Sequence, residues 1–224
     1  MPMANMTHGT MQRVEMPFEE FGPYLRTLEP NQAIAHGVPY NHSGEDNQVF
    51  KIGLRGNERP PDLLSRSKNH LEYPKNTACL AMFDHDPKPS QQPLSVEEFL
   101  SIIVKVAPRF VHYPTWHTPS TSSCIYDLEG NQLTGEGSGF HLYFPYCNSA
   151  DLSSFADRLF KRLWLAGHGY IFISKAGSML ERSIFDKAVF SPERLDFVSG
   201  ANCIDCTQRL PAPVLRVGME VINA

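Results

Sequence analysis

Apolar runs with the two-residue period of strands alternate along the chain with segments whose apolar residues recur at helical spacing. The strongest early strand signal covers residues 79–83, and residues 140–146 alternate as another strand. Strands and amphipathic helices that follow one another in this way are typical of layered domains. The pattern therefore predicts an α/β or α+β fold.

The two strongest helix predictions rest on capping signals as well as on periodicity. Ser95 and Glu98 have the spacing of a capping box, and apolar residues at 99–106 follow at helical spacing until Pro108. A second helix is predicted over 149–167, where an apolar face begins after Ser149 and a glycine ends the segment.

Weaker signals divide the rest of the chain. We expect a helix or turn at 17–28 and an extended loop or hairpin, rich in Ser, Thr and Gly, at 117–139. Short strands are expected at 32–38, 48–53, 110–113 and 170–174, an apolar element at 184–190 and a loop at 57–61. These elements predict one domain over 17–210, a flexible lead-in at 1–16, and a C-terminal tail or the start of a linker at 211–224.

Composition suits a globular chain with a full core, because 42% of the 224 residues are hydrophobic and 20% are charged. The formal charge of −4 weakly opposes a nucleic-acid-binding function, although bases outnumber acids over 157–193. Cys203 and Cys206 have a zinc-like spacing, but no second pair completes four ligands, so we do not expect zinc. No segment suits a membrane span or a signal peptide, and we expect a cytoplasmic protein without a membrane partner.

Three carboxylates carry the strongest candidate chemistry. Asp84 and Asp86 close the strand predicted at 79–83, and Pro87 stops it. Strand residues two apart share a face, so both carboxylates point the same way and repel unless a cation lies between them. A third carboxylate, Asp186, would complete a site for magnesium or manganese and metal-assisted phosphoryl or nucleotidyl transfer. The alternative for Asp84 and Asp86 is a solvated acidic turn.

Polar residues that suit phosphate binding lie in other segments. His141 shares a strand face with Tyr143 and follows two glycines, which allow a ligand to approach closely. Although a lone strand histidine is more often structural, a histidine beside bound metals can donate to a phosphate oxygen. Ser120, Ser122 and Ser123 form either an ordinary turn or a cradle of donors for a triphosphate.

Several cations accompany these motifs. Arg66, Lys68 and Lys175 lie near presumed strand ends, and Arg182 and Arg194 bracket Asp186. Surface salt bridges are the alternative role, but guanidinium groups also bind phosphate in bidentate fashion. Arg162 belongs to the basic stretch at 157–193.

Taken together and in order, these motifs resemble those of the archaeo-eukaryotic primase superfamily, particularly the primase-polymerase domains of plasmids, phages and integrated elements. The family's first motif, an apolar strand that ends in Asp-x-Asp, is matched by residues 80–86. Gly139-Phe140-His141 matches its second motif, a small residue, any residue and histidine, and Phe185-Asp186 matches its third. Stretches at 26–33, 119–123 and 182–195 look similar to the mobile-element branch.

This resemblance implies an α/β fold of two modules, the second with a sheet like an RNA-recognition motif, and an active site in the cleft between them. It implies a primase or primase-polymerase that makes or extends short strands on single-stranded DNA, with NTPs or dNTPs as substrates. Asp84, Asp86 and Asp186 would hold two magnesium or manganese ions. The implied nucleotide contacts are His141, Ser120, Ser122, Ser123, Arg66, Lys68, Lys175 and Arg182, and the implied template contacts are Arg194 and Arg162.

Two other functions remain open at this stage. The same carboxylates could serve a metal-dependent nuclease, or the chain could be a replication-initiation module that binds DNA without catalysis. A phosphate loop of the helicase type is missing from the sequence, so we expect a helicase to act in trans or from a further C-terminal region. The sequence leaves open ribo- or deoxynucleotide preference, priming or extension, and magnesium or manganese.

Overall fold

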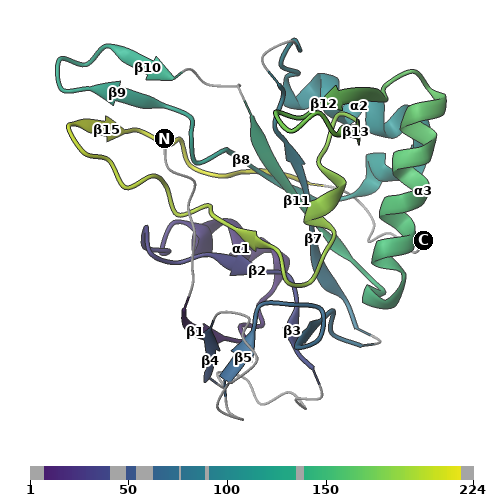
Figure 1. Cartoon of the computed structure of the whole chain (residues 1–224), viewed down its shortest axis with the longest axis horizontal. Coiled ribbons are helices and arrows are strands. Elements are labelled where there is room, and N and C mark those ends of the chain that lie inside the picture. The colour runs from purple at the N-terminus through teal and green to yellow at the C-terminus, as the bar shows by residue number, and fades with distance from the viewer. Residues whose placement is uncertain are drawn as a thin grey trace.

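The computed structural model describes residues 8–40, 49–53, 63–75, 77–88, 91–134 and 139–217. Its central sheet has four strands in the order β16-β8-β11-β7, and every neighbouring pair is antiparallel. The strands are β7 (Cys79–His85), β8 (Thr115–Pro119), β11 (Phe140–Tyr146) and β16 (Val214–Arg216). Figure 1 shows β7, β8 and β11 crossing the middle of the molecule.

Two helices cover one face of this sheet. Helix α2 (Val96–Val106) follows β7, and helix α3 (Leu152–Leu165) follows β11. The ring of Phe99 in α2 lies 5.6 Å from that of Phe83 in β7, and Phe155 in α3 lies 5.2 Å from Tyr146 in β11. Both helices therefore pack on the face to which alternate residues of β7 and β11 point (Figure 1).

The opposite face is covered by helix α1 (Phe18–Leu25) and a two-stranded ladder of β2 (Ile34–Ala35) and β14 (Leu195–Asp196). The ring of Phe21 in α1 meets that of Tyr143 edge-on at 4.9 Å. A Cβ atom at Gly22 would lie 2.4 Å from the ring of Trp116, so only glycine lets α1 approach the sheet this closely.

Small elements surround the two layers. A three-stranded sheet joins β1 (Gly9–Gln12), β4 (Val49–Gly53) and β5 (Leu63–Ser65), and β3 (Val38–Pro39) pairs with β6 (Leu71–Glu72). A second three-stranded sheet joins β9 (Ile125–Asp127), β10 (Gln132–Thr134) and β15 (Cys206–Gln208), and β12 (Tyr170–Ile173) forms a hairpin with β13 (Met179–Arg182). The 3-10 helices are η1 (Pro108–His112), η2 (Ser149–Asp151) and η3 (Lys187–Val189).

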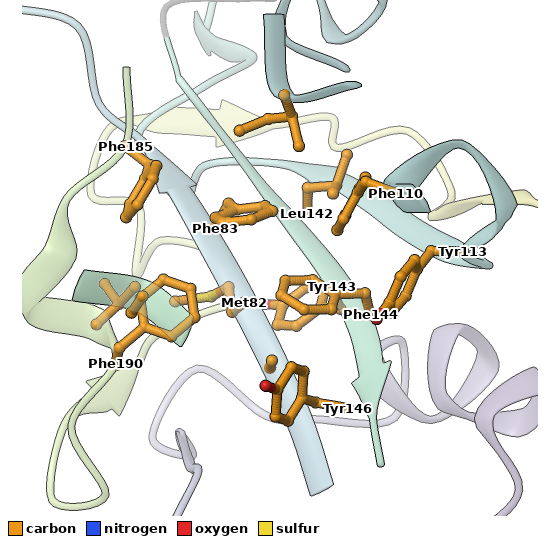
Figure 2. Close-up of a cluster of buried hydrophobic side chains, with 14 of the residues drawn as sticks. Met82, Phe83, Phe110, Tyr113, Leu142, Tyr143, Phe144, Tyr146, Phe185 and Phe190 are labelled. Atoms are coloured by element: carbon orange, nitrogen blue, oxygen red, sulfur yellow. The ribbon is translucent and has the colours of Figure 1, made fainter. Parts of the chain in front are cut away.

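Aromatic side chains form the core between the sheet and the α2–α3 layer (Figure 2). Phe83 is fully buried at its centre. Its ring lies 4.8 to 5.7 Å, between centroids, from the rings of Phe99, Phe110, Phe144, Phe185 and Phe190. These rings come from four separate parts of the chain, so Phe83 joins β7 to α2, η1, β11 and the segment around η3.

The main sequence predictions are confirmed at the level of mixed α and β structure, with three α-helices and several small sheets among the described residues. The predicted strand at 79–83 is part of β7, and the capping box is complete. Glu98 N–H donates to Ser95 Oγ at 3.2 Å, and Ser95 N–H donates to Glu98 Oε2 at 2.8 Å. None of the described helices has the length and apolarity that crossing a membrane requires.

The prediction of a strand at 110–113 was wrong, for a local reason. Most of residues 110–113 form the 3-10 helix η1, which begins at Pro108, in place of the expected strand. The rings of Phe110 and Tyr113 stack there, with their centroids 4.8 Å apart. Residues three apart eclipse one another in a 3-10 helix, so a stacked aromatic pair fits that conformation. The helix predicted at 149–167 is confirmed as α3, which the 3-10 turn η2 directly precedes. The loop expected at 57–61 lies outside the described residues.

Both ends of the chain contain strands where the sequence predicted a lead-in and a tail. Within 1–16, β1 pairs with β4, and within 211–224, β16 pairs with β8 as the edge strand of the central sheet. The guanidinium of Arg216 in β16 also donates to Tyr113 O and Val111 O at 3.2 and 3.1 Å. These strands are too short for their periodicity to stand out, so only the pairing reveals them.

We expect Phe83→Ala to lower the free energy of unfolding by about 3–5 kcal/mol, because it removes a fully buried ring and leaves a cavity. Denaturant-induced unfolding of the full chain measures the change. The control is Leu165→Ala at the end of α3, where the side chain is 89% exposed and a change within about 0.5 kcal/mol is expected. Equal losses in both variants would contradict this view of the core.

Candidate active site

The ends of β7 and β11 bring the first carboxylate and the histidine together. In the antiparallel register, Asp84 is the direct partner of His141. Paired residues on neighbouring strands project from the same face, and here it is the face opposite the aromatic core. Asp84 Oδ1 lies 3.6 Å from His141 Nε2. The sequence placed both residues at strand positions, and the pairing of the strands makes them neighbours.

Asp186 joins them because its segment runs along the free edge of β7. Its backbone N–H donates to Asp84 O at 2.9 Å. Phe185, one residue earlier, is buried beside Phe83, with ring centroids 5.0 Å apart. Asp186 also caps η3, since its Oδ1 accepts from Ala188 N at 3.0 Å. The buried phenylalanine and the backbone hydrogen bond thus hold the third carboxylate beside the first.

His85, between the two carboxylates of the Asp-x-Asp motif, has a structural role. It is buried and points into the aromatic face, 4.9 Å from the ring of Phe140. One ring nitrogen, Nδ1, lies 2.7 Å from Ile184 O, and the other, Nε2, accepts from Leu94 N at 3.2 Å. Burial lowers the pKa of His85, which agrees with a neutral ring that donates through Nδ1. It therefore ties the Asp186 segment to β7.

Each of the three carboxylates has a cationic partner. Asp86 Oδ2 lies 2.5 Å from Lys88 Nζ, and Asp186 Oδ1 lies 3.4 Å from Arg182 Nη1, while Asp84 faces His141. Asp86, Lys88, Arg182 and Asp186 line one pocket of about 80 Å³, together with Tyr170 and Gln91 among others. Sequence reasoning identified Arg182 but missed Lys88, although Lys88 follows Asp86 by only two residues.

The carboxylates provide the oxygen donors that a hard divalent cation prefers. Among the residues that the structure describes, however, no group of three Asp, Glu, His or Cys side chains is already arranged to hold a metal. Burial raises the pKa of Asp84; His141 opposes this rise, and the charges of Asp86, Asp196 and Asp186 add to it. The charge of a divalent cation would relieve this repulsion, but the carboxylates would first have to exchange their present cationic partners for the metal.

A buried pair of side chains holds the other side of His141. Asp196 Oδ1 lies 3.0 Å from His141 Nδ1, and Tyr143 Oη donates to Asp196 Oδ2 at 2.5 Å. Burial alone would lower the pKa of His141, but Asp196, and after it Asp84, raise the pKa to about 9. Burial likewise would raise the pKa of Asp196, but His141 holds it below its usual value. The two carboxylates therefore favour the protonated imidazole, and Asp196 is a site residue that sequence reasoning missed.

The serine loop lies next to the carboxylates. Ser120 Oγ lies 3.0 Å from Ser122 Oγ and 3.2 Å from Ser123 Oγ, so the three hydroxyls form one hydrogen-bonded group. A Cβ atom at Gly139 would lie 2.8 Å from His85 O, 3.5 Å from Ser120 Oγ and 3.7 Å from Asp86 Cα. Gly139 thus lets the start of β11, the serine loop and the end of β7 meet.

Gln208 in β15 fixes the conformation of the serine loop. Its Nε2 donates to both Thr121 O and Ser123 O at 2.8 Å, and its Oε1 accepts from Ala201 N at 2.6 Å. One side chain therefore ties the loop to the segment that follows β14. No motif in the sequence marked Gln208, because its role depends on pairing between distant strands.

The remaining predicted cations are not joined to the carboxylates by any contact within the described residues. Lys175 is exposed in the turn between β12 and β13, and Arg66 and Lys68 are exposed in the turn after β5. Arg194 is exposed just before β14. Arg162, in α3, donates to Val106 O at the end of α2, so its guanidinium joins the two helices.

No protein-family model matches the chain, and neither a curated protein nor a solved structure matches it significantly. The resemblance to primases therefore rests on the sequence motifs, and the geometry around them is what can support a function.

We expect the free energy of unfolding to decrease as the pH rises from about 6.5 through about 9. The folded-state pKa of His141, about 9, lies above the usual histidine value of 6.5, so its pairing stabilises the fold fully below pH 6.5, and this stabilisation is lost as the pH rises through about 9. Denaturant unfolding at a series of pH values measures this dependence, which His141→Gln should remove. The control variant, His112→Gln, changes an exposed histidine in η1 and should keep it. The same dependence in His141→Gln would contradict the assignment.

We expect Gln208→Glu to loosen the serine loop, because a carboxylate cannot donate to the carbonyls of Thr121 and Ser123. The amide hydrogens of Ser120 and Ser123 should exchange with solvent roughly tenfold faster or more, as the loss of these hydrogen bonds implies. Hydrogen exchange followed by NMR measures the rates. Gln132→Glu, at an exposed position of β10, is the matched control. Unchanged exchange rates in the Gln208 variant would show that the hydrogen bonds from Gln208 do not fix the conformation of the serine loop.

Proposed function

We propose that the chain is a template-directed nucleotidyltransferase, a primase-polymerase that makes or extends short strands on single-stranded DNA during replication of a mobile element. The observation that carries this proposal is the meeting of Asp84, Asp186 and His141, which come from three distant parts of the sequence. These are the residues that the three primase-like motifs identify. A solvated acidic turn gives no reason for Asp186 and His141 to lie beside Asp84.

The order of the structural elements also supports the proposal. The chain runs β7–α2–β8–β11–α3, with both helices on one face, and the Asp186 segment then returns to the free edge of β7. This is the path of a split β-α-β unit, which an RNA-recognition-like sheet would follow. The candidate site lies on the other face of that sheet, towards α1, β2 and β14, as expected for a site between two modules.

In the proposed reaction, Asp84, Asp86 and Asp186 hold the divalent ions. Bound magnesium or manganese would activate the attacking hydroxyl and neutralise the charge of the leaving pyrophosphate. His141, as a cation, would donate to the incoming triphosphate, with Arg182 and Lys88 on one side and the serine loop on the other. This arrangement favours polymerisation over nucleolysis, because a nuclease has no need of a triphosphate site.

The template would be single-stranded DNA, supplied by a helicase in trans or from another region of a longer protein. Of the two template candidates, Arg194 is exposed and so suits a backbone contact, whereas Arg162 already donates to a helix carbonyl. Arg194 is therefore the template contact that we retain in the proposal.

We expect the purified chain to incorporate labelled NTPs or dNTPs on single-stranded DNA with magnesium or manganese, with a primer or without one. Asp84→Asn should reduce incorporation by more than about 100-fold, which exceeds the loss expected for an outer partner of a metal site. Product without a primer would identify a primase. The control is Asp151→Asn, an exposed aspartate beside Asn148 beyond the far end of β11, which should incorporate at the wild-type rate.

Two outcomes would contradict the proposal. Degradation of the DNA, lost in Asp84→Asn, would favour a metal-dependent nuclease. DNA binding that is unchanged in Asp84→Asn, without incorporation under any of these conditions, would favour a replication-initiation module.

A further inference from the structure

Asp196 is a buried carboxylate to which none of the recognised motifs gives a role. Its side chain is 1% exposed, and it lies on the face of the central sheet that carries the candidate site. The short strand β14 holds it there, because Asp196 pairs with Ile34 and Leu195 pairs with Ala35 in β2. A buried carboxylate is costly unless it is paired and hydrogen-bonded, so its partners indicate what it does.

Both oxygens of Asp196 face strand β11. Tyr143 Oη donates to Oδ2 at 2.5 Å, and Oδ1 lies 3.0 Å from His141 Nδ1. Tyr143 and His141 are two residues apart on one strand and share a face, so a single carboxylate reaches both. The ring of Tyr143 is itself buried, with the ring of Phe21 edge-on at 4.9 Å. The hydroxyl that holds Asp196 therefore has a fixed position.

This arrangement gives the two nitrogens of His141 different surroundings. Nδ1 faces Asp196, with Tyr143 Oη also 3.3 Å away, and Nε2 faces the carboxylate of Asp84 at 3.6 Å. A group that holds one imidazole nitrogen decides where the other points and whether it carries a proton. With Nδ1 held, the N–H at Nε2 points towards Asp84 and towards a ligand bound beside that carboxylate.

We infer that Asp196, with its carboxylate fixed by Tyr143, is a positioning residue that directs Nε2–H of His141 to a phosphate oxygen of the bound nucleoside triphosphate. The nucleotide as ligand rests on the proposed function, whereas the orientation of His141 by Asp196 does not. His36 lies close enough for its charge to be influenced by both Asp196 and His141, but its Nδ1 lies 3.4 Å from Leu80 O. It therefore belongs to the surroundings of the pair rather than to the positioning contact.

The first experiment measures the histidine side-chain nitrogens by NMR in the full chain without nucleotide. We expect a hydrogen-bonded Nδ1 signal of His141, assigned by its loss in His141→Gln, that Asp196→Asn removes or shifts strongly and Tyr143→Phe shifts less. Asp151→Asn, an exposed aspartate outside the site, should leave it unchanged. A His141 signal that is the same in wild type, Asp196→Asn and Tyr143→Phe would overturn the inference. If Asp196→Asn does not fold, Tyr143→Phe alone decides.

The second experiment measures binding of the magnesium complexes of the α,β-methylene analogues of ATP and dATP. Asp196→Asn and His141→Gln should each weaken binding by about 10- to 100-fold, by analogy with the loss of an outer partner of a metal-bound histidine. The double variant should bind no more weakly than His141→Gln, because Asp196 acts only through His141. Effects that multiply in the double variant would overturn the inference.

The two experiments separate this inference from the proposed function. Wild-type protein that binds neither analogue would contradict the nucleotidyltransferase proposal, and the nitrogen signals would still decide whether Asp196 orients His141. Wild-type protein that binds both analogues, with unchanged affinity in Asp196→Asn, would overturn the positioning role and leave the proposed function in place.

Discussion

The candidate site depends on the antiparallel register between β7 and β11. In this register Asp84 pairs with His141 and Phe83 pairs with Leu142. The candidate site residues and the core residues therefore lie on opposite faces of the same two strands. A shift of one residue would exchange the faces of a strand and turn Asp84 into the space that Phe83 now fills. Because Phe83 packs against rings from four parts of the chain, the aromatic core fixes the carboxylate one residue away.

Grouping several carboxylates at one strand end has an electrostatic cost, and the chain compensates for it locally. Lys88 follows Asp86 by two residues, and Arg182 precedes Asp186 by four, so short segments bring each cation to its partner. Both ion pairs are partly exposed, and pairs of this kind contribute little to stability. Their partners can therefore change at small cost, which is what binding of a metal and an anionic substrate would require.

The sequence predicted those parts of the fold and site whose signals are local. The capping box at Ser95, the strand that ends in Asp84 and Asp86, and the turn rich in serine could all be identified from a few neighbouring residues. Asp196 and Gln208 could not, because each acts through a partner more than fifty residues away, and a single aspartate or glutamine has no distinctive local pattern. Strand β16 and helix η1 were missed because three to five residues are too few to establish a period.

Three side chains outside the predicted motif residues hold the parts of the site that the central sheet does not. His85 ties the Asp186 segment to β7, Tyr143 holds Asp196 against β11, and Gln208 clamps the serine loop. His85 and Tyr143 lie within two residues of a motif residue on the same strand, so each strand supplies both a chemical group and the anchor of a neighbouring segment. Short, irregular segments can then present their carboxylates and hydroxyls as firmly as a strand would, because each is fixed by a buried or fully hydrogen-bonded side chain.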